Sequence, residues 1–160
     1  MSAPTPAPSD PPRPDTITSR GAPEPLGAYP HARRAGGLLF LSGIGPRTRG
    51  SAAIPGVRLA ADGGVASYDF EVQARACFEN VRTVLEQSGS SLDRAVDVLG
   101  MLTDLRRDFA VYNRLYAEYF GGSGACRTTI EVARLPQGGS APIAIELKVI
   151  ALAGPGPEVP

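Results

Sequence analysis

The strongest constraint on the fold is that only two segments of this chain have the periodicity of an amphipathic helix. In residues 69–88 apolar side chains recur every three or four positions, from Phe70 to Leu85, and Gly89 follows as a helix stop. Residues 108–120 show the same spacing. Strand-like segments lie before, between and after these helices, at residues 29–34, 38–42, 95–103, 126–136 and 143–150.

The expected element order is therefore β-β-α-β-α-β-β, with residues 16–18 as a candidate extra edge strand. Two helices can cover only one face of a sheet of five or six strands. Because the strands are apolar on the other face as well, we expect that face to be buried by self-association. The pattern predicts an α+β domain that is not monomeric.

The two ends of the chain differ in composition from its middle. Residues 1–24 are rich in proline and poor in large apolar side chains, which predicts a disordered tail. Residues 154–160 predict a second flexible tail, so residues 25–153 form the expected single domain. Within this domain, residues 47–67 predict a long polar loop or an irregular hairpin.

The charge balance and the few reactive side chains exclude several classes of function. The chain has 16 basic and 16 acidic residues, which argues against a general role in binding nucleic acid or a membrane surface. It has no apolar run of about 18 residues and no signal-like N-terminus, so a cytoplasmic location is expected. Cys77 and Cys126 are expected to be free thiols, and since His31 is the only histidine, no metal site is expected.

Two charged residues stand in the strands near the C-terminal end. Arg127 opens the segment Cys-Arg-Thr-Thr-Ile-Glu-Val-Ala-Arg-Leu-Pro, and Glu146 lies between Ile145 and Leu147. We place them at matching heights on neighbouring strands. There they could form a structural ion pair, or an arginine that binds a substrate carboxylate could lie beside an acid/base.

These segments resemble the signature of the RidA/YjgF family of small imine deaminases. The resemblance extends over residues 25–153 through Gly-Ala-Tyr at 27–29, Leu-Phe-Leu-Ser-Gly at 39–43, Phe-Glu-Asn-Val at 78–81 and Asp-Phe-Ala-Val-Tyr-Asn at 108–113. It implies a chorismate-mutase-like fold, with two helices on one face of a mixed sheet. It also implies a homotrimer around a central β-barrel, with a cleft at each subunit boundary.

The resemblance also implies roles for individual residues. Arg127 matches the arginine that binds the substrate carboxylate, and Glu146 matches the acidic residue that positions or activates water. The other positions that match the family are substrate-binding residues: Tyr29, Ser42, Gly43 and Asn113. Ser42 is also expected to be catalytic, together with Arg127 and Glu146. The implied chemistry is hydrolysis of an enamine or imine without a cofactor. A role in RNA cleavage is unattractive for a chain with no basic stripe.

The segments 29–36 and 112–120 resemble the branch of the family that includes 2-aminomuconate deaminases. This substrate is a dicarboxylate and needs a second cation, for which Arg47 is the best-placed candidate, with His31 and Arg33 behind it. Arg33 and Arg34 are expected to be solvated surface charges. Two other functions stay open: a broad-specificity deaminase of 2-aminoacrylate and related small imines, and a carboxylate-binding regulatory or chaperone-like module without catalysis.

Overall fold

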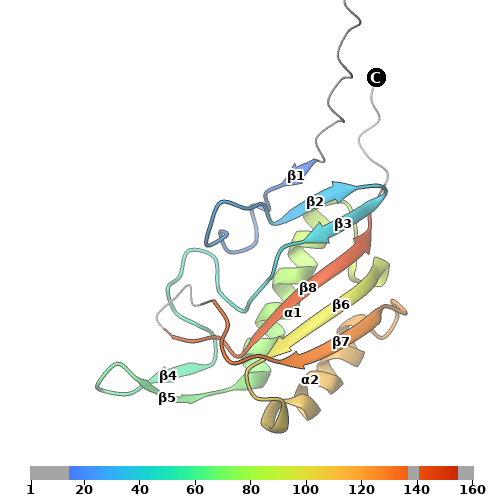
Figure 1. Ribbon diagram of the computed structural model, residues 1–160. Coiled ribbons are helices and arrows are strands. Elements are labelled where there is room, and N and C mark those ends of the chain that lie inside the picture. Colours follow the sequence, from blue (N-terminus) through green and yellow to red (C-terminus); the bar gives the residue numbers. More distant parts are fainter. Residues whose placement is uncertain (1–14, 137–140, 155–160) are drawn as a thin grey trace, which may run out of the picture.

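Six strands form one mixed sheet, and two helices cover one of its faces (Figure 1). The computed structural model describes residues 15–136 and 141–154. Its elements in chain order are β1 (Thr16–Ile17), β2 (Ala32–Ala35), β3 (Leu38–Leu41), β4 (Val57–Leu59), β5 (Val65–Tyr68), α1 (Phe70–Gln87), η1 (Leu92–Arg94), β6 (Ala95–Leu102), α2 (Leu105–Phe120), β7 (Cys126–Glu131) and β8 (Ile145–Leu152). Strands β4 and β5 form a separate hairpin, as the irregular-hairpin prediction for residues 47–67 allowed.

Each helix begins at an aspartate that caps it. The Asp69 carboxylate accepts a hydrogen bond from the Val72 N–H at 3.2 Å, and α1 ends before Gly89, whose φ of 75° suits glycine. At α2 the cap is Asp104, whose carboxylate accepts from the Arg107 N–H at 3.0 Å. The helix therefore begins at Leu105, three residues earlier than the predicted start at residue 108.

The order of strands in the sheet is β1-β2-β3-β8-β6-β7, with β6 and β7 parallel and all other pairs antiparallel. Strand β6 thus lies between β7 and β8, so Arg127 and Glu146 are not on neighbouring strands. Their heights also differ, because Arg127 is level with Val98 and Glu146 with Met101. The prediction of matching heights on adjacent strands is wrong.

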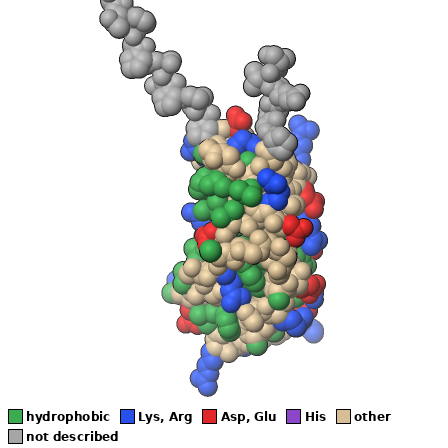
Figure 2. Space-filling view, turned by 90° about the vertical axis from the view of Figure 1, so that its right-hand side faces the viewer, with side chains coloured by type: hydrophobic (Ala, Val, Ile, Leu, Met, Phe, Trp, Pro, Cys, Tyr) green, Lys and Arg blue, Asp and Glu red, His purple; other side chains and the backbone are tan. Residues whose placement is uncertain are grey.

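The two faces of the sheet have different environments. Along β8, Ile145, Leu147, Val149 and Ala151 are buried under α1, in the main core of the protein. The residues between them point to the open face, together with Phe40 of β3, which is 39% exposed. Figure 2 shows a patch of hydrophobic side chains at the upper left of the molecule and many acidic and basic side chains along its right edge. Burial of this face in a trimer stays a prediction.

Residues 15–24 pack against the domain and do not form the disordered tail that their composition predicts. Strand β1 pairs with β2, and Ala22 is fully buried. The Gln87 side-chain carbonyl accepts hydrogen bonds from the Ser19 hydroxyl at 2.8 Å and from the Arg20 N–H at 2.9 Å. The rest of the predicted N-terminal tail, residues 1–14, lies outside the described residues.

At the other end of the chain, the structure describes only the first residue of the predicted flexible tail. The Gly154 carbonyl accepts a hydrogen bond from the Arg34 guanidinium at 2.7 Å. Residues 155–160 lie outside the described residues.

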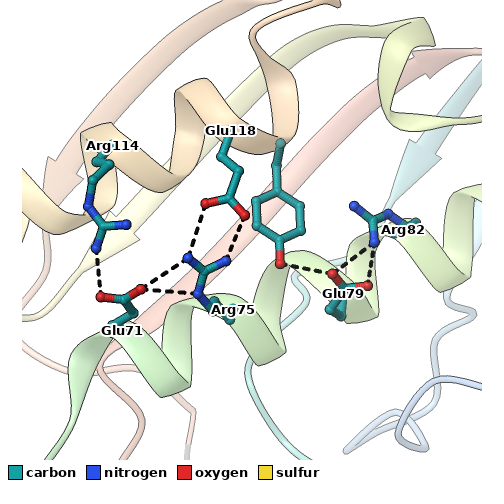
Figure 3. A network of polar contacts seen from close by, with 7 residues as sticks. Glu71, Arg75, Glu79, Arg82, Arg114 and Glu118 are labelled. Carbon is teal, nitrogen blue, oxygen red and sulfur yellow. Dashed lines mark hydrogen bonds and ion pairs between the residues drawn. The ribbon is translucent and has the colours of Figure 1, made fainter.

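The outer surfaces of the two helices are joined by ion pairs (Figure 3). Arg75 of α1 contacts Glu118 of α2 at 2.7 Å and Glu71 of its own helix at 3.0 Å, and Arg114 of α2 contacts Glu71 at 2.6 Å. Such exposed pairs contribute little each. These pairs lie on the outer side of the helices, away from the open face of the sheet. No helix within the described ranges is long and apolar enough to cross a membrane.

Candidate active site

A cavity of about 600 Å³ opens on the exposed face of the sheet, beside β3 and β8. Its volume lies in the range usual for small-molecule sites. The residues that line it combine apolar walls with one carboxylate and three cations: Leu26, Tyr29, Pro30, Arg33, Phe40, Leu41, Ser42, Gly43, Gly45, Arg47, Pro136, Ile143, Glu146 and Lys148. Five of the predicted site residues are thereby brought together: Tyr29, Ser42, Gly43, Arg47 and Glu146.

Among the residues that the structure describes, Glu146 is the only carboxylate that lines this cavity. Its side chain is half-buried, and this loss of solvation raises the pKa of the carboxyl, while the nearby Arg47 charge acts in the opposite direction. A raised pKa suits a group that exchanges protons with a substrate or with water near neutral pH. Glycine at position 43 makes room for this carboxylate, because a Cβ there would overlap a Glu146 oxygen.

The backbone that precedes Gly43 is fixed by hydrogen bonds to the neighbouring loop. The Ser42 hydroxyl donates to the Pro30 carbonyl at 2.6 Å, and the Ser42 N–H donates to the His31 carbonyl at 2.9 Å. The Ser42 proton is thus engaged, which leaves the oxygen as an acceptor toward the cavity. Tyr29 is 45% exposed, and its hydroxyl accepts from the Leu26 N–H at 3.2 Å.

The two residues predicted to bind a second carboxylate have different environments. Arg47 lines the cavity, although one of its guanidinium nitrogens donates to the Glu24 carbonyl at 2.7 Å. His31 is only 2% exposed, and both ring nitrogens contact the backbone: Nδ1 accepts from the Ser19 N–H at 3.0 Å, and Nε2 lies 2.9 Å from the Pro23 carbonyl. The substrate-binding role predicted for His31 is therefore replaced by a structural one.

Arg127 lies outside the cavity, on the helix side of the sheet. Its guanidinium donates to the Asn113 side-chain carbonyl at 2.8 Å. The ring centroids of Tyr116, Tyr112 and Phe109 surround it at 4.7, 5.8 and 5.9 Å. These aromatic residues repeat along one face of α2 and hold the exposed guanidinium by cation–π contacts. Within one chain, Arg127 and Glu146 are on opposite faces of the sheet, so no ion pair joins them.

Sequence reasoning missed two groups of residues. It named Arg33 only as a weaker candidate cation and favoured a solvated surface charge for it, and it gave Lys148 no binding role, whereas both line the cavity. The signal was the alternation of β8, which places Lys148 on the same face as Glu146. It also treated the aromatic face of α2 as core alone. No cluster of three metal-ligating side chains occurs among the residues that the structure describes.

The sequence and the fold have counterparts among known proteins. The sequence model of the family described as Endoribonuclease L-PSP matches residues 19–153. The chain belongs to the RidA/YjgF family. A RutC family protein of Pyrococcus horikoshii is 36% identical over 86% of this chain and 96% of its own length. The chloroplastic Reactive Intermediate Deaminase A of Arabidopsis thaliana is 33% identical over 76% of this chain and 59% of its own length.

Solved structures of RidA/YjgF relatives have the same architecture. Escherichia coli TdcF with bound serine has a TM-score of 0.71 and 28% identity, covering 88% of this chain and 99% of that chain. YyfA of the Rid protein family from Yersinia pestis has a TM-score of 0.69 and 30% identity, covering 88% and 99%. These similarities confirm the family and the predicted α+β fold with two helices on one face.

Proposed function

We propose that this protein hydrolyses an enamine or imine of a carboxylic acid and releases ammonia, with 2-aminomuconate as the substrate. The observation that carries the proposal is the half-buried Glu146, with a raised pKa, facing a cavity that also holds Ser42 and Gly43. Two relatives bear names that agree with this chemistry. One is a reactive intermediate deaminase, and the other binds serine, a small molecule with a carboxylate and an amine.

In the proposed reaction, 2-aminomuconate first tautomerises from the enamine to the imine. Glu146 then holds a water molecule, accepts its proton as the oxygen attacks the imine carbon, and returns a proton to the departing ammonia. The product is 2-oxo-3-hexenedioate. Arg127 binds the carboxylate next to the reacting carbon, with help from the Gly43 N–H. The Ser42 proton is held by the Pro30 carbonyl, so the Ser42 oxygen accepts a hydrogen bond from the substrate nitrogen. Tyr29 covers the substrate, and Asn113 orients the Arg127 guanidinium.

This division of roles needs two subunits. Arg127 and Glu146 are on opposite faces of the sheet in one chain, and only Glu146 faces the cavity. We infer that the Arg127 side chain at the edge strand β7 completes the cavity of a neighbouring copy in a trimer. The exposed apolar side chains of the open face, among them Phe40, Ile130 and Leu152, supply a surface for that assembly.

The test is a coupled assay in which enzymatically generated 2-aminomuconate is followed with and without the protein. Arg127→Ala should lower kcat/KM by about 10²–10³-fold, because a charge-assisted pair of hydrogen bonds to the carboxylate is lost. Arg127→Lys should recover little, since lysine cannot form the bidentate contact. Arg106→Ala is the matched control, because Arg106 of α2 is also an exposed arginine. Full activity of Arg127→Ala would refute the proposal.

The same assay separates the alternatives. A broad-specificity deaminase would turn over 2-aminoacrylate as fast as 2-aminomuconate, whereas a binding module would take up 2-oxo acids and turn over neither. Cleavage of RNA, which the family description names, finds little support in this site. The single histidine of the chain has both ring nitrogens bound by backbone groups, so it cannot serve as a general base.

A further inference from the structure

The cavity holds more positive charge than a single carboxylate substrate requires. Arg33, Arg47 and Lys148 line it, against the one carboxylate of Glu146. Arg47 is engaged by the Glu24 carbonyl, whereas no ion pair to Arg33 or Lys148 occurs within the part of the chain that the structure describes. Unpaired cations that converge on one cavity favour an anionic ligand group.

The strand register places these two cations away from the reacting group. Lys148 is two residues beyond Glu146 on β8 and points to the same face, about 7 Å along the strand. Arg33 of β2 is level with Phe40 of β3, which is level with Ile150 of β8, so Arg33 lies on the far side of Lys148 from Glu146. If the reacting carbon of a ligand lies at Glu146, Lys148 and Arg33 can contact only a second group of that ligand, several bonds away from the reacting carbon.

The geometry points to Lys148 and Arg33 as a subsite for the distal carboxylate of a dicarboxylate substrate. The inference rests on the proposed function, since it assumes that the reacting carbon lies at Glu146. It assigns the choice between dicarboxylate and monocarboxylate substrates to these two residues and not to His31. Phe40 is level with Arg33, is 39% exposed and lines the same cavity, so its ring would pack against the carbon chain of such a ligand.

The test compares the binding of two six-carbon diene acids by titration calorimetry. Muconate carries two carboxylates and sorbate carries one. We expect the protein to bind muconate at least about tenfold more tightly than sorbate, because a desolvated carboxylate gains charge-assisted hydrogen bonds. Lys148→Met and Arg33→Met should each reduce that ratio toward unity and leave the sorbate affinity unchanged. Arg58→Met, in the β4–β5 hairpin away from the cavity, is the control and should keep the full ratio.

Three results would overturn the inference: an equal affinity of the unaltered protein for the two acids, a full preference in Lys148→Met, or an equal loss in Arg58→Met. Lys148→Arg keeps the charge and should keep the preference, which guards against a variant that is merely misassembled. The outcome is independent of turnover. A preference that depends on Lys148 without deamination of any imine would leave the subsite standing and refute the proposed reaction. Deamination by a protein that does not prefer muconate over sorbate would support the proposed reaction and refute the subsite.

Discussion

Replacement of Gly43 by alanine tests whether the position of the Glu146 carboxylate controls the reaction. A Cβ at residue 43 would overlap a Glu146 carboxylate oxygen and lie 2.8 Å from Cδ, where ordinary contact begins at 3.4 Å. The carboxyl group must therefore move away by at least about 0.6 Å. A catalytic group that is misplaced by about 1 Å costs about 10²-fold in rate, so we expect Gly43→Ala to lower kcat by up to about that factor. Because the overlapping group is the end of a flexible side chain, the expected cost in stability is only about 1 kcal/mol.

The assay is a double-mutant cycle with kcat as the readout. Glu146→Ala alone should lower kcat by about 10²–10⁴-fold, the range for a general acid or base. In that background Gly43→Ala has no carboxylate to displace, so it should lower kcat no further. Gly45→Ala is the control, because its Cβ would meet a methyl carbon of Ile143 instead. Additive effects of the two changes, or an unaffected rate in Gly43→Ala, would refute the reasoning.

Three further predictions concern Glu146, Tyr116 and His31. Because burial raises the pKa of Glu146, the folded protein binds more protons than the unfolded chain above pH 4.5. The free energy of unfolding should therefore fall as the pH rises from 4.5 through the pKa of Glu146 in the folded protein. Denaturant titrations across this pH range should show that Glu146→Gln lacks this dependence. Tyr116→Leu removes the nearest ring from Arg127 and should raise KM about tenfold with little change in kcat, while Tyr116→Phe keeps the ring and should behave as the unaltered protein in steady-state kinetics. His31→Ala leaves the buried Ser19 N–H without its acceptor and should cost about 1–3 kcal/mol, or several degrees of Tm in calorimetry, and an unchanged Tm would contradict the structural role of the ring.

Local periodicity was enough to predict most elements of the fold. The pattern from Phe70 to Leu85 located α1 to within a residue or two at each end, and the alternation around Glu146 located β8. The start of α2 was missed because three charged residues, 106–108, separate Leu105 from Phe109. The signals were the four-residue spacing of Leu105 and Phe109 and the capping aspartate at 104. Hydrophobic periodicity does not determine the order of strands in a sheet. Arg127 and Glu146 were therefore predicted to be on neighbouring strands, although β6 separates β7 from β8.

The candidate site was predicted through the family motif rather than through physical reasoning on single residues. Ser42, Gly43 and Glu146 meet in one cavity, as that motif implied. The environment of His31 depends on Ser19 and Pro23, in a segment whose composition had predicted disorder, so its role could not be predicted locally. Lys148 and Arg33 line the cavity because they are on the open face of the sheet. Which face is open can be told only when the positions of both helices are known.

The separation of Arg127 and Glu146 by the sheet has a genetic consequence. If each site takes its arginine from one chain and its glutamate from the next, Arg127→Ala and Glu146→Gln inactivate different halves of the same site. Two inactive proteins, produced together in one cell, would assemble into mixed trimers in which about a quarter of the boundaries join an intact arginine to an intact glutamate. The two alleles would then complement each other: a cell that produces both variants would recover part of the activity that each variant lacks alone.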